Sequence, residues 1–290
     1  MHESMLAYAG KRYLWVALGL IAVAALAYGW YRPVEAPNGG TWLGYTLGSV
    51  AALLILWLTA YGIRKRSYRS NLGTLRGWLS AHVYLGTALV AIATLHSGFQ
   101  FGWNVHTLAY ALMCLVVVSG CVGVVLYLRY PAAMSANRGD MNRDQLLGEI
   151  ADIDQKAVRL AAQLPREFAD LIASNRDRTV IGGGAFALLA GGDRSRLVLP
   201  DSQTPVTNPE QSAILAWLGD QLSRSTDGTR SQYIQDLLAL VSLRKALLVR
   251  LRRDLKLQAW LEIWLYVHVP LSFALLAALV THVLVVFLYW

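Results

Sequence analysis

Charged residues are scarce in this sequence, and their scarcity already excludes an ordinary soluble protein. Only 15% of its 290 residues are charged, whereas 56% are hydrophobic. Soluble domains carry about 25% charged residues. The composition therefore predicts a membrane protein that also has a polar portion.

Cysteine is almost absent, since the chain has only Cys114 and Cys121. On one apolar helix they would lie about 10 Å apart along the axis, which is too far for a disulfide. The sequence has no Cys-x-x-Cys-His motif, and this excludes covalent attachment of a c-type haem. No cysteine cluster is available for zinc or for an iron–sulfur centre. We predict that both thiols are buried packing residues.

Histidine is also rare, and four of the six histidines form two matching pairs. Thirteen residues separate His82 from His96, and thirteen separate His268 from His282, in stretches that are otherwise apolar. Fourteen positions at 100° each make about 1400°, roughly 40° short of four turns, so each pair shares one face of a helix. The rise is about 21 Å, which places one histidine of each pair in each leaflet of a bilayer.

Ionisable side chains inside a membrane are costly and mark a functional site by default. Imidazole is a common axial ligand of haem iron. Two helices with the same spacing could therefore face each other and hold two haems, one above the other, as a path for single electrons. Intramembrane histidines can also merely hydrogen-bond a neighbouring helix or relay protons. The identical interval in both pairs favours haem ligation.

Five apolar segments are long enough to cross a bilayer. Four of them lie within residues 1–130, at about 12–31, 42–63, 77–98 and 106–130, and the fifth occupies 258–290. The intervening insert, 131–257, is polar and contains neither histidine nor cysteine. Apolar residues recur at helical spacing at both ends of the insert, with turn-rich stretches between them. We expect an all-α membrane protein with five transmembrane helices and a mostly helical polar insert.

The formal net charge of +8 arises from basic residues that lie beside apolar segments, which is typical of membrane orientation rather than of nucleic-acid binding. The loop at 64–77 has five basic residues and no acid, whereas the loops at 32–41 and 99–105 contain one basic residue between them, Arg32. By the positive-inside rule, the N-terminus and the insert are cytoplasmic. We expect an integral protein of a bacterial inner membrane.

This orientation makes the third and fifth spans run in the same direction. His82 and His268 would then share the inner leaflet, and His96 and His282 the outer leaflet. Topology and spacing therefore predict the same two ligand pairs, one for the iron of an inner haem and one for the iron of an outer haem.

A second basic cluster immediately precedes the fifth span and consists of Arg244, Lys245, Arg250, Arg252, Arg253 and Lys256. Such a cluster can anchor the chain on anionic membrane lipid. It can also dock an acidic redox partner, and the sequence leaves both functions open.

A haem between helices needs small residues where it approaches backbone, and polar partners for its propionates. Candidate small residues are Gly48 and Gly62, again fourteen apart, and Gly86 one turn after His82. Arg76 is the expected propionate partner of the inner haem. Asn104 and His106 are candidates at the outer haem, although His106 could equally be a plain interfacial residue.

Bound imidazoles also need acceptors for their second nitrogen. The candidate hydroxyls are those of Ser80, Ser272 and Thr281. Each of these hydroxyls could instead bond back to its own helix.

The third span, with HVYLG and LHSGFQFG, resembles the second helix of the di-haem cytochrome b bundle of respiratory bc complexes. The fifth span, HVPLSFALLAALVTH, is similar to the fourth helix of that bundle. The resemblance covers spans two to five and implies a four-helix bundle with two b-type haems. It implies that His82 and His268 ligate one haem and that His96 and His282 ligate the other.

The same resemblance implies that Gly48 and Gly62 correspond to the paired glycines of the family's first bundle helix. The chain departs from the family in its extra N-terminal span, in the insert, and in lacking the PEWY motif of the quinol-oxidising site. Quinol oxidation of the bc type is therefore not expected. A second resemblance is to the ferric reductase transmembrane family, which places paired histidines on its third and fifth spans but has a sixth span.

These resemblances lead to three functional hypotheses. In the first, the chain is the electron-transfer subunit of an oxidoreductase complex and moves single electrons between the quinone pool and an iron–sulfur or multihaem partner, with a bound quinone as a further expected ligand. In the second, it is a transmembrane reductase of ferric iron or another extracellular acceptor. In the third, it is a non-redox membrane scaffold whose insert binds partners.

Overall fold

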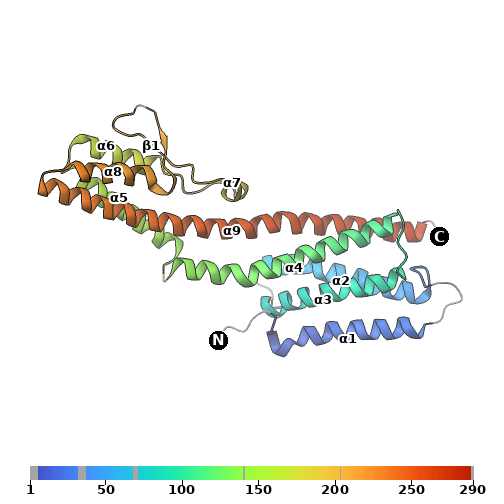
Figure 1. Cartoon of the computed structure of the whole chain (residues 1–290). Helices are drawn as coiled ribbons and strands as arrows, with labels where there is room; N and C mark the ends of the chain where they lie inside the picture. The colour runs from blue at the N-terminus through green and yellow to red at the C-terminus, as the bar shows by residue number, and fades with distance from the viewer. Residues whose placement is uncertain (1–5, 32–36, 68–70, 140, 203, 289–290) are drawn as a thin grey trace. The chain divides into compact units, whose positions relative to one another are not determined.

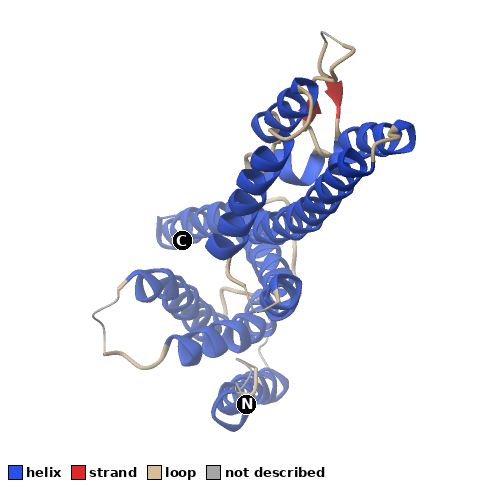
Figure 2. Ribbon diagram, turned by 90° about the vertical axis from the view of Figure 1, so that its left-hand side faces the viewer, coloured by secondary structure: helices blue, strands red, loops and turns tan. Residues whose placement is uncertain are grey.

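The structure is a computed structural model that describes residues 6–31, 37–67, 71–139, 141–202 and 204–288. Arg32 and Arg69, which contribute to the predicted orientation, lie outside the described residues, as do the last two residues of the predicted fifth span. The described chain is almost entirely helical (Figures 1 and 2), and its only sheet is a two-stranded one.

Five helices in the described residues are long and apolar enough to cross a membrane. They are α1 (Tyr8–Trp30), α2 (Trp42–Arg66), α3 (Leu75–Ser97), α4 (Val105–Arg138) and α9 (Gly228–Leu288). This confirms the predicted helical class and the membrane character of the protein. The helices α4 and α9 extend well beyond the predicted spans, into the polar insert, and contain Pro131 and Pro270. Proline lacks an N–H and its ring crowds the carbonyl four residues earlier, which weakens a helix locally, but both helices continue past it.

The chain divides into two compact units, one of Met1–Val125 with Trp264–Trp290 and one of Leu126–Ile263. In the first unit, α1, α2 and α3 pack against one another (Figure 1), and α3 supplies the largest share of the buried core. Its buried positions recur at helical spacing and include Ala81, Ala88, Leu89 and Ile92. Small residues let helix backbones approach closely, which is how membrane helices pack without a hydrophobic driving force between them.

The ends of these helices are set by local hydrogen bonds. Thr41 and Thr74 precede α2 and α3, and each hydroxyl accepts from the backbone N–H three residues later. Gly98 ends α3 with a φ of +59°. A side chain at this position would bring a Cβ within 1.9 Å of the Pro37 carbonyl oxygen, so the close approach of the preceding loop requires glycine.

The second unit contains α5 (Arg143–Ala161), α6 (Arg166–Asp177), α7 (Ala185–Ala190), β1 (Arg196–Leu197), β2 (Val206–Thr207), a 3₁₀ turn (Pro209–Gln211) and α8 (Ser212–Arg224). The predicted apolar stripes at both ends of the insert are largely buried, for example Ile150 on α5 and Leu248 on α9. The short α7 and the strand β2 lie in stretches that we expected to be turn-rich, and β1 lies between those stretches. Such short elements depend on tertiary contacts rather than on periodicity.

The prediction that both cysteines are buried is wrong for Cys121. Both thiols are free, but Cys114 is half-buried whereas Cys121 is exposed. Cys114 packs against the core of the first unit. The two cysteines lie on nearly the same side of α4, but the side chains that cover Cys114 do not reach Cys121.

Candidate functional site

The two histidines of α3 are both held by backbone carbonyls of α2. The Nδ1 atom of His82 lies 3.1 Å from the carbonyl oxygen of Leu58. The Nδ1 atom of His96 lies 2.8 Å from the carbonyl oxygen of Gly44. A carbonyl oxygen can only accept, so in both residues Nδ1 carries the proton and donates it.

On α9, His268 is held by a side chain of α4. Its Nδ1 lies 2.7 Å from the Ser119 hydroxyl oxygen. The Ser119 oxygen also lies 2.8 Å from the carbonyl oxygen of Val116, so its one proton can go either to that carbonyl or to His268 Nδ1. Trp264 contacts both residues. Its indole N–H donates to the Ser119 carbonyl at 2.8 Å, and its ring stacks on His268 with centroids 5.4 Å apart.

These contacts fix one tautomer in two of the four paired histidines. In His82 and His96 the Nδ1–H donates to a backbone carbonyl, which leaves the lone pair on Nε2. Within the described part of the chain, the Nε2 atoms of His82, His96 and His268 have no hydrogen-bond partner. Histidines that bind a metal through Nε2 present this arrangement, because their other ring nitrogen donates to a protein acceptor.

The fourth histidine of the pairs, His282, lies in a cluster of three imidazoles. Its Nδ1 is 2.7 Å from the Nδ1 of His106, with ring centroids 4.6 Å apart. Its ring also lies 6.0 Å from that of His96, at an interplanar angle of 80°. The Nδ1 atoms of His106 and His282 share one proton, so the tautomer of His282 depends on that of His106.

The predicted glycines have different surroundings. A Cβ at Gly48 would lie 2.7 Å from Cε1 and 2.8 Å from Nδ1 of His96, so glycine here makes room for the imidazole itself. A Cβ at Gly62 or at Gly86 would meet nothing within 4 Å. The fourteen-residue interval between Gly48 and Gly62 therefore does not correspond to two equivalent contacts within the described protein.

Two glycines of α4 lie against side chains of α9. A Cβ at Gly123 would lie 2.1 Å from the Trp264 ring, and one at Gly120 would lie 3.6 Å from Cε1 of His268. Together with Ser119, these residues give α4 a small face against His268. The small residues at 119 and 123 have the spacing of a small-xxx-small motif, which could have indicated this contact.

The acceptors that we proposed from the sequence are not the ones that the histidines use. The hydroxyls of Ser272 and Thr281 bond back to carbonyls of their own helix, as the alternative interpretation predicted. The Ser80 hydroxyl is buried and has no partner among the described residues. The actual partners are the two α2 carbonyls and Ser119.

The expected propionate partners are also placed by the structure. Arg76 is exposed in the first turn of α3. The Asn104 side chain accepts from the backbone N–H of Thr107 at the start of α4, at 3.0 Å. His106 is exposed and bonds to His282, so it does more than occupy the interface.

The described residues contain no group of three or more His, Cys, Asp or Glu side chains that could hold a metal ion. A haem iron, by contrast, takes only two axial ligands from the protein. The donors present are four imidazoles, two of them with a fixed tautomer, and this donor set suits two bis-histidine haems.

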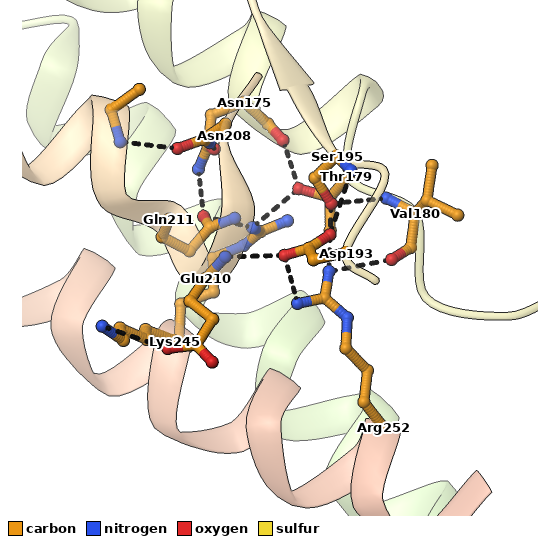
Figure 3. A network of polar contacts seen from close by, with 12 residues as sticks. Asn175, Thr179, Val180, Asp193, Ser195, Asn208, Glu210, Gln211, Lys245 and Arg252 are labelled. Atoms are coloured by element: carbon orange, nitrogen blue, oxygen red, sulfur yellow. Dashed lines mark hydrogen bonds and ion pairs between the residues drawn. The ribbon is translucent and has the colours of Figure 1, made fainter. Parts of the chain in front are cut away.

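A separate polar network lies in the second unit (Figure 3). Asp193 accepts from the backbone N–H groups of Ser195 and Glu210 and from Arg252. Burial raises the pKa of the Asp193 carboxyl, but the hydrogen bonds of Ser195 and Glu210 and the charge of Arg252 outweigh it, so its pKa lies below the usual value. This ion pair joins α9 to the loop before β1.

The neighbouring Arg244, which is only 3% exposed, binds Asp154, Thr179 and Gln211. Almost every group in this part of the network has a partner within the protein, the buried Nε2 of Gln211 being the exception. A network satisfied in this way stabilises the fold of the unit and does not present a reactive group.

Comparison with known protein families, with curated proteins and with solved structures finds no match to this chain.

Proposed function

We propose that this protein is a di-haem b-type membrane cytochrome that passes single electrons across the membrane. His82 and His268 would ligate the iron of the inner haem, and His96 and His282 that of the outer haem. The observation that carries this proposal is that three of the four histidines are held through Nδ1, with the tautomer imposed by a carbonyl in two of them.

A histidine that only packs between helices can have either tautomer. A ligand that binds through Nε2 must be unprotonated there. Two backbone carbonyls of α2 select that state in His82 and His96. The Ser119 hydroxyl of α4 holds His268 through the same ring nitrogen, Nδ1. The use of Nδ1 in all three residues supports ligation over packing. The carbonyl acceptors would also orient the rings and raise the basicity of the ligands.

The outer pair also has a suitable separation. With metal–nitrogen bonds of about 2.0 Å, two imidazoles that share one metal have ring centroids about 6 Å apart. The rings of His96 and His282 lie 6.0 Å apart. Gly48 supports the same geometry, because it allows the His96 ring to lie directly against α2.

When bound, two such haems supply reversible one-electron chemistry whose potential depends on the axial ligands and their hydrogen bonds. Since histidines would fill both axial positions, the protein would transfer electrons without binding a substrate at iron. We therefore propose the role of an electron-transfer subunit between the quinone pool, with a bound quinone, and an iron–sulfur or multihaem partner. The N-terminus and the insert would face the cytoplasm of a bacterium.

The test is a reduced-minus-oxidised absorption spectrum of the purified protein, together with a haem-to-protein ratio. We expect b-type bands and two haems per chain. His82→Ala and His268→Ala should each remove one haem, and His96→Ala and His282→Ala the other. Ser272→Ala is the matched control, because its hydroxyl bonds only to its own helix, and it should keep both haems.

A colourless protein, or one whose haem content is unchanged by all four histidine substitutions, would refute the proposal. The non-redox scaffold predicts a colourless protein that assembles equally well with and without the histidines. That result would therefore favour the scaffold.

A further inference from the structure

The six basic residues before the last span have two different roles in the structure. Three of them form ion pairs inside the second unit. The pairs are Arg244 with Asp154 at 2.6 Å, Lys245 with Glu210 at 3.7 Å, and Arg252 with Asp193 at 2.5 Å. Arg244 and Arg252 are largely buried in their pairs and hold the unit together, whereas the Lys245 pair is exposed and only offsets the charge of Lys245.

The other three, Arg250, Arg253 and Lys256, are exposed. Among the described residues none of their side chains forms an ion pair. They follow one another at steps of three along α9, and Trp260, which is 47% exposed, comes four residues after the last. At 100° per residue, all four positions fall within a strip about 120° wide. We call these four residues the α9 strip.

No acidic side chain offsets this positive charge on α9. The only acid between Arg244 and Trp260 is Asp254, which is 1% exposed and is bound by Arg138 and Arg143. Glu262, beyond Trp260, accepts a hydrogen bond from Gln258. The strip therefore presents three unneutralised cations.

The strip leads directly into the apolar part of α9. From residue 263 to residue 288 the sequence has no Asp, Glu, Lys or Arg. Tryptophan is typical of the membrane–water interface. Lys256 and Arg253 lie about 6 Å and 10 Å from Trp260 along the helix axis, and Arg250 about 15 Å. The polar layer of a bilayer is about 5–7 Å thick on each side, and the long stems of Lys and Arg extend their reach.

We propose that the α9 strip binds the phosphate groups of anionic phospholipids, with Lys256 and Arg253 as the principal contacts and Arg250 as a weaker one. The combination of cations with an exposed tryptophan at the start of a span favours lipid over an acidic protein, since a soluble partner would have no need of the interfacial ring. This inference does not depend on haem binding.

The experiment uses the purified full chain in detergent and native mass spectrometry with added phosphatidylglycerol or phosphatidylcholine. The parent should retain phosphatidylglycerol preferentially. A juxtamembrane basic residue contributes about fivefold to binding of an anionic surface, so Arg253→Gln with Lys256→Gln should reduce the preference about 25-fold. Arg250→Gln should reduce it by less than fivefold, because it lies further from the interface.

The matched control is Lys156→Gln with Arg159→Gln, which removes two exposed cations from α5 and should leave the preference unchanged. Circular dichroism and the melting temperature of each variant verify folding. Equal retention of the two lipids by the parent would overturn the proposal, as would a double variant with the parent's preference. A double variant that keeps the lipid preference but loses binding to an acidic redox protein would assign the strip to that partner instead.

Discussion

Gly48 and Gly62 provide the sharpest test of the site. The fourteen-residue interval and the family resemblance treat them as equivalent, but the structure does not. At Gly48 a methyl group would lie 2.7 Å from Cε1 of His96, closer than real Cβ contacts allow. At Gly62, which is exposed on the same helix, it would meet nothing within 4 Å.

The expected magnitudes follow from these surroundings. In Gly48→Ala the His96 ring must move, and overpacking of this kind costs about 1–3 kcal/mol. The movement would also strain the 2.8 Å hydrogen bond to Gly44, whose loss costs about 0.5–1.5 kcal/mol. In Gly62→Ala only the helix preference changes, which stabilises by about 0.5–1 kcal/mol.

The assay is thermal unfolding in detergent, combined with the haem-to-protein ratio of each variant. Gly48→Ala should lower the melting temperature and deplete the outer haem, whereas Gly62→Ala should keep both haems and melt no lower than the parent. Equal destabilisation by the two substitutions would refute the reasoning, because it would mean that both glycines contact the same kind of group.

Two further predictions test other contacts. Ser119→Ala removes the half-buried hydrogen bond that holds His268 Nδ1, and losing such a bond costs about 0.5–1.5 kcal/mol; the melting temperature should fall and the inner haem should be the one depleted, whereas depletion of the outer haem would contradict the assignment. Asp193→Asn should lower the melting temperature at neutral pH because it removes the charge opposite Arg252. Since the folded pKa of Asp193 lies below its ordinary value of 3.8, its stabilising effect is present above pH 3.8 and is lost as the pH falls through the folded pKa. The difference between parent and variant should therefore shrink below pH 3.8, and a difference that grew on acidification would contradict the ion pair.

Some features of the site have no sequence signature. Every residue has a backbone carbonyl, so nothing in the sequence of α2 distinguishes Leu58 and Gly44 as the acceptors for His82 and His96. Ser119 is one of many hydroxyls in the spans, and its role depends on which face of α4 meets α9. The bond between His106 and His282 joins residues that are 176 positions apart.

The sequence by itself determined the helical class, the five apolar spans and the shared face of each histidine pair. These properties follow from hydrophobicity and from a fixed rotation per residue, both of which are local. Only the tertiary structure decided which nitrogen of His82 and of His96 is protonated, why glycine is needed at position 48 but not at position 62, and which cations before the last span are already neutralised. Those outcomes depend on atoms from distant segments that meet only when the helices pack, and no local rule of spacing encodes such a meeting.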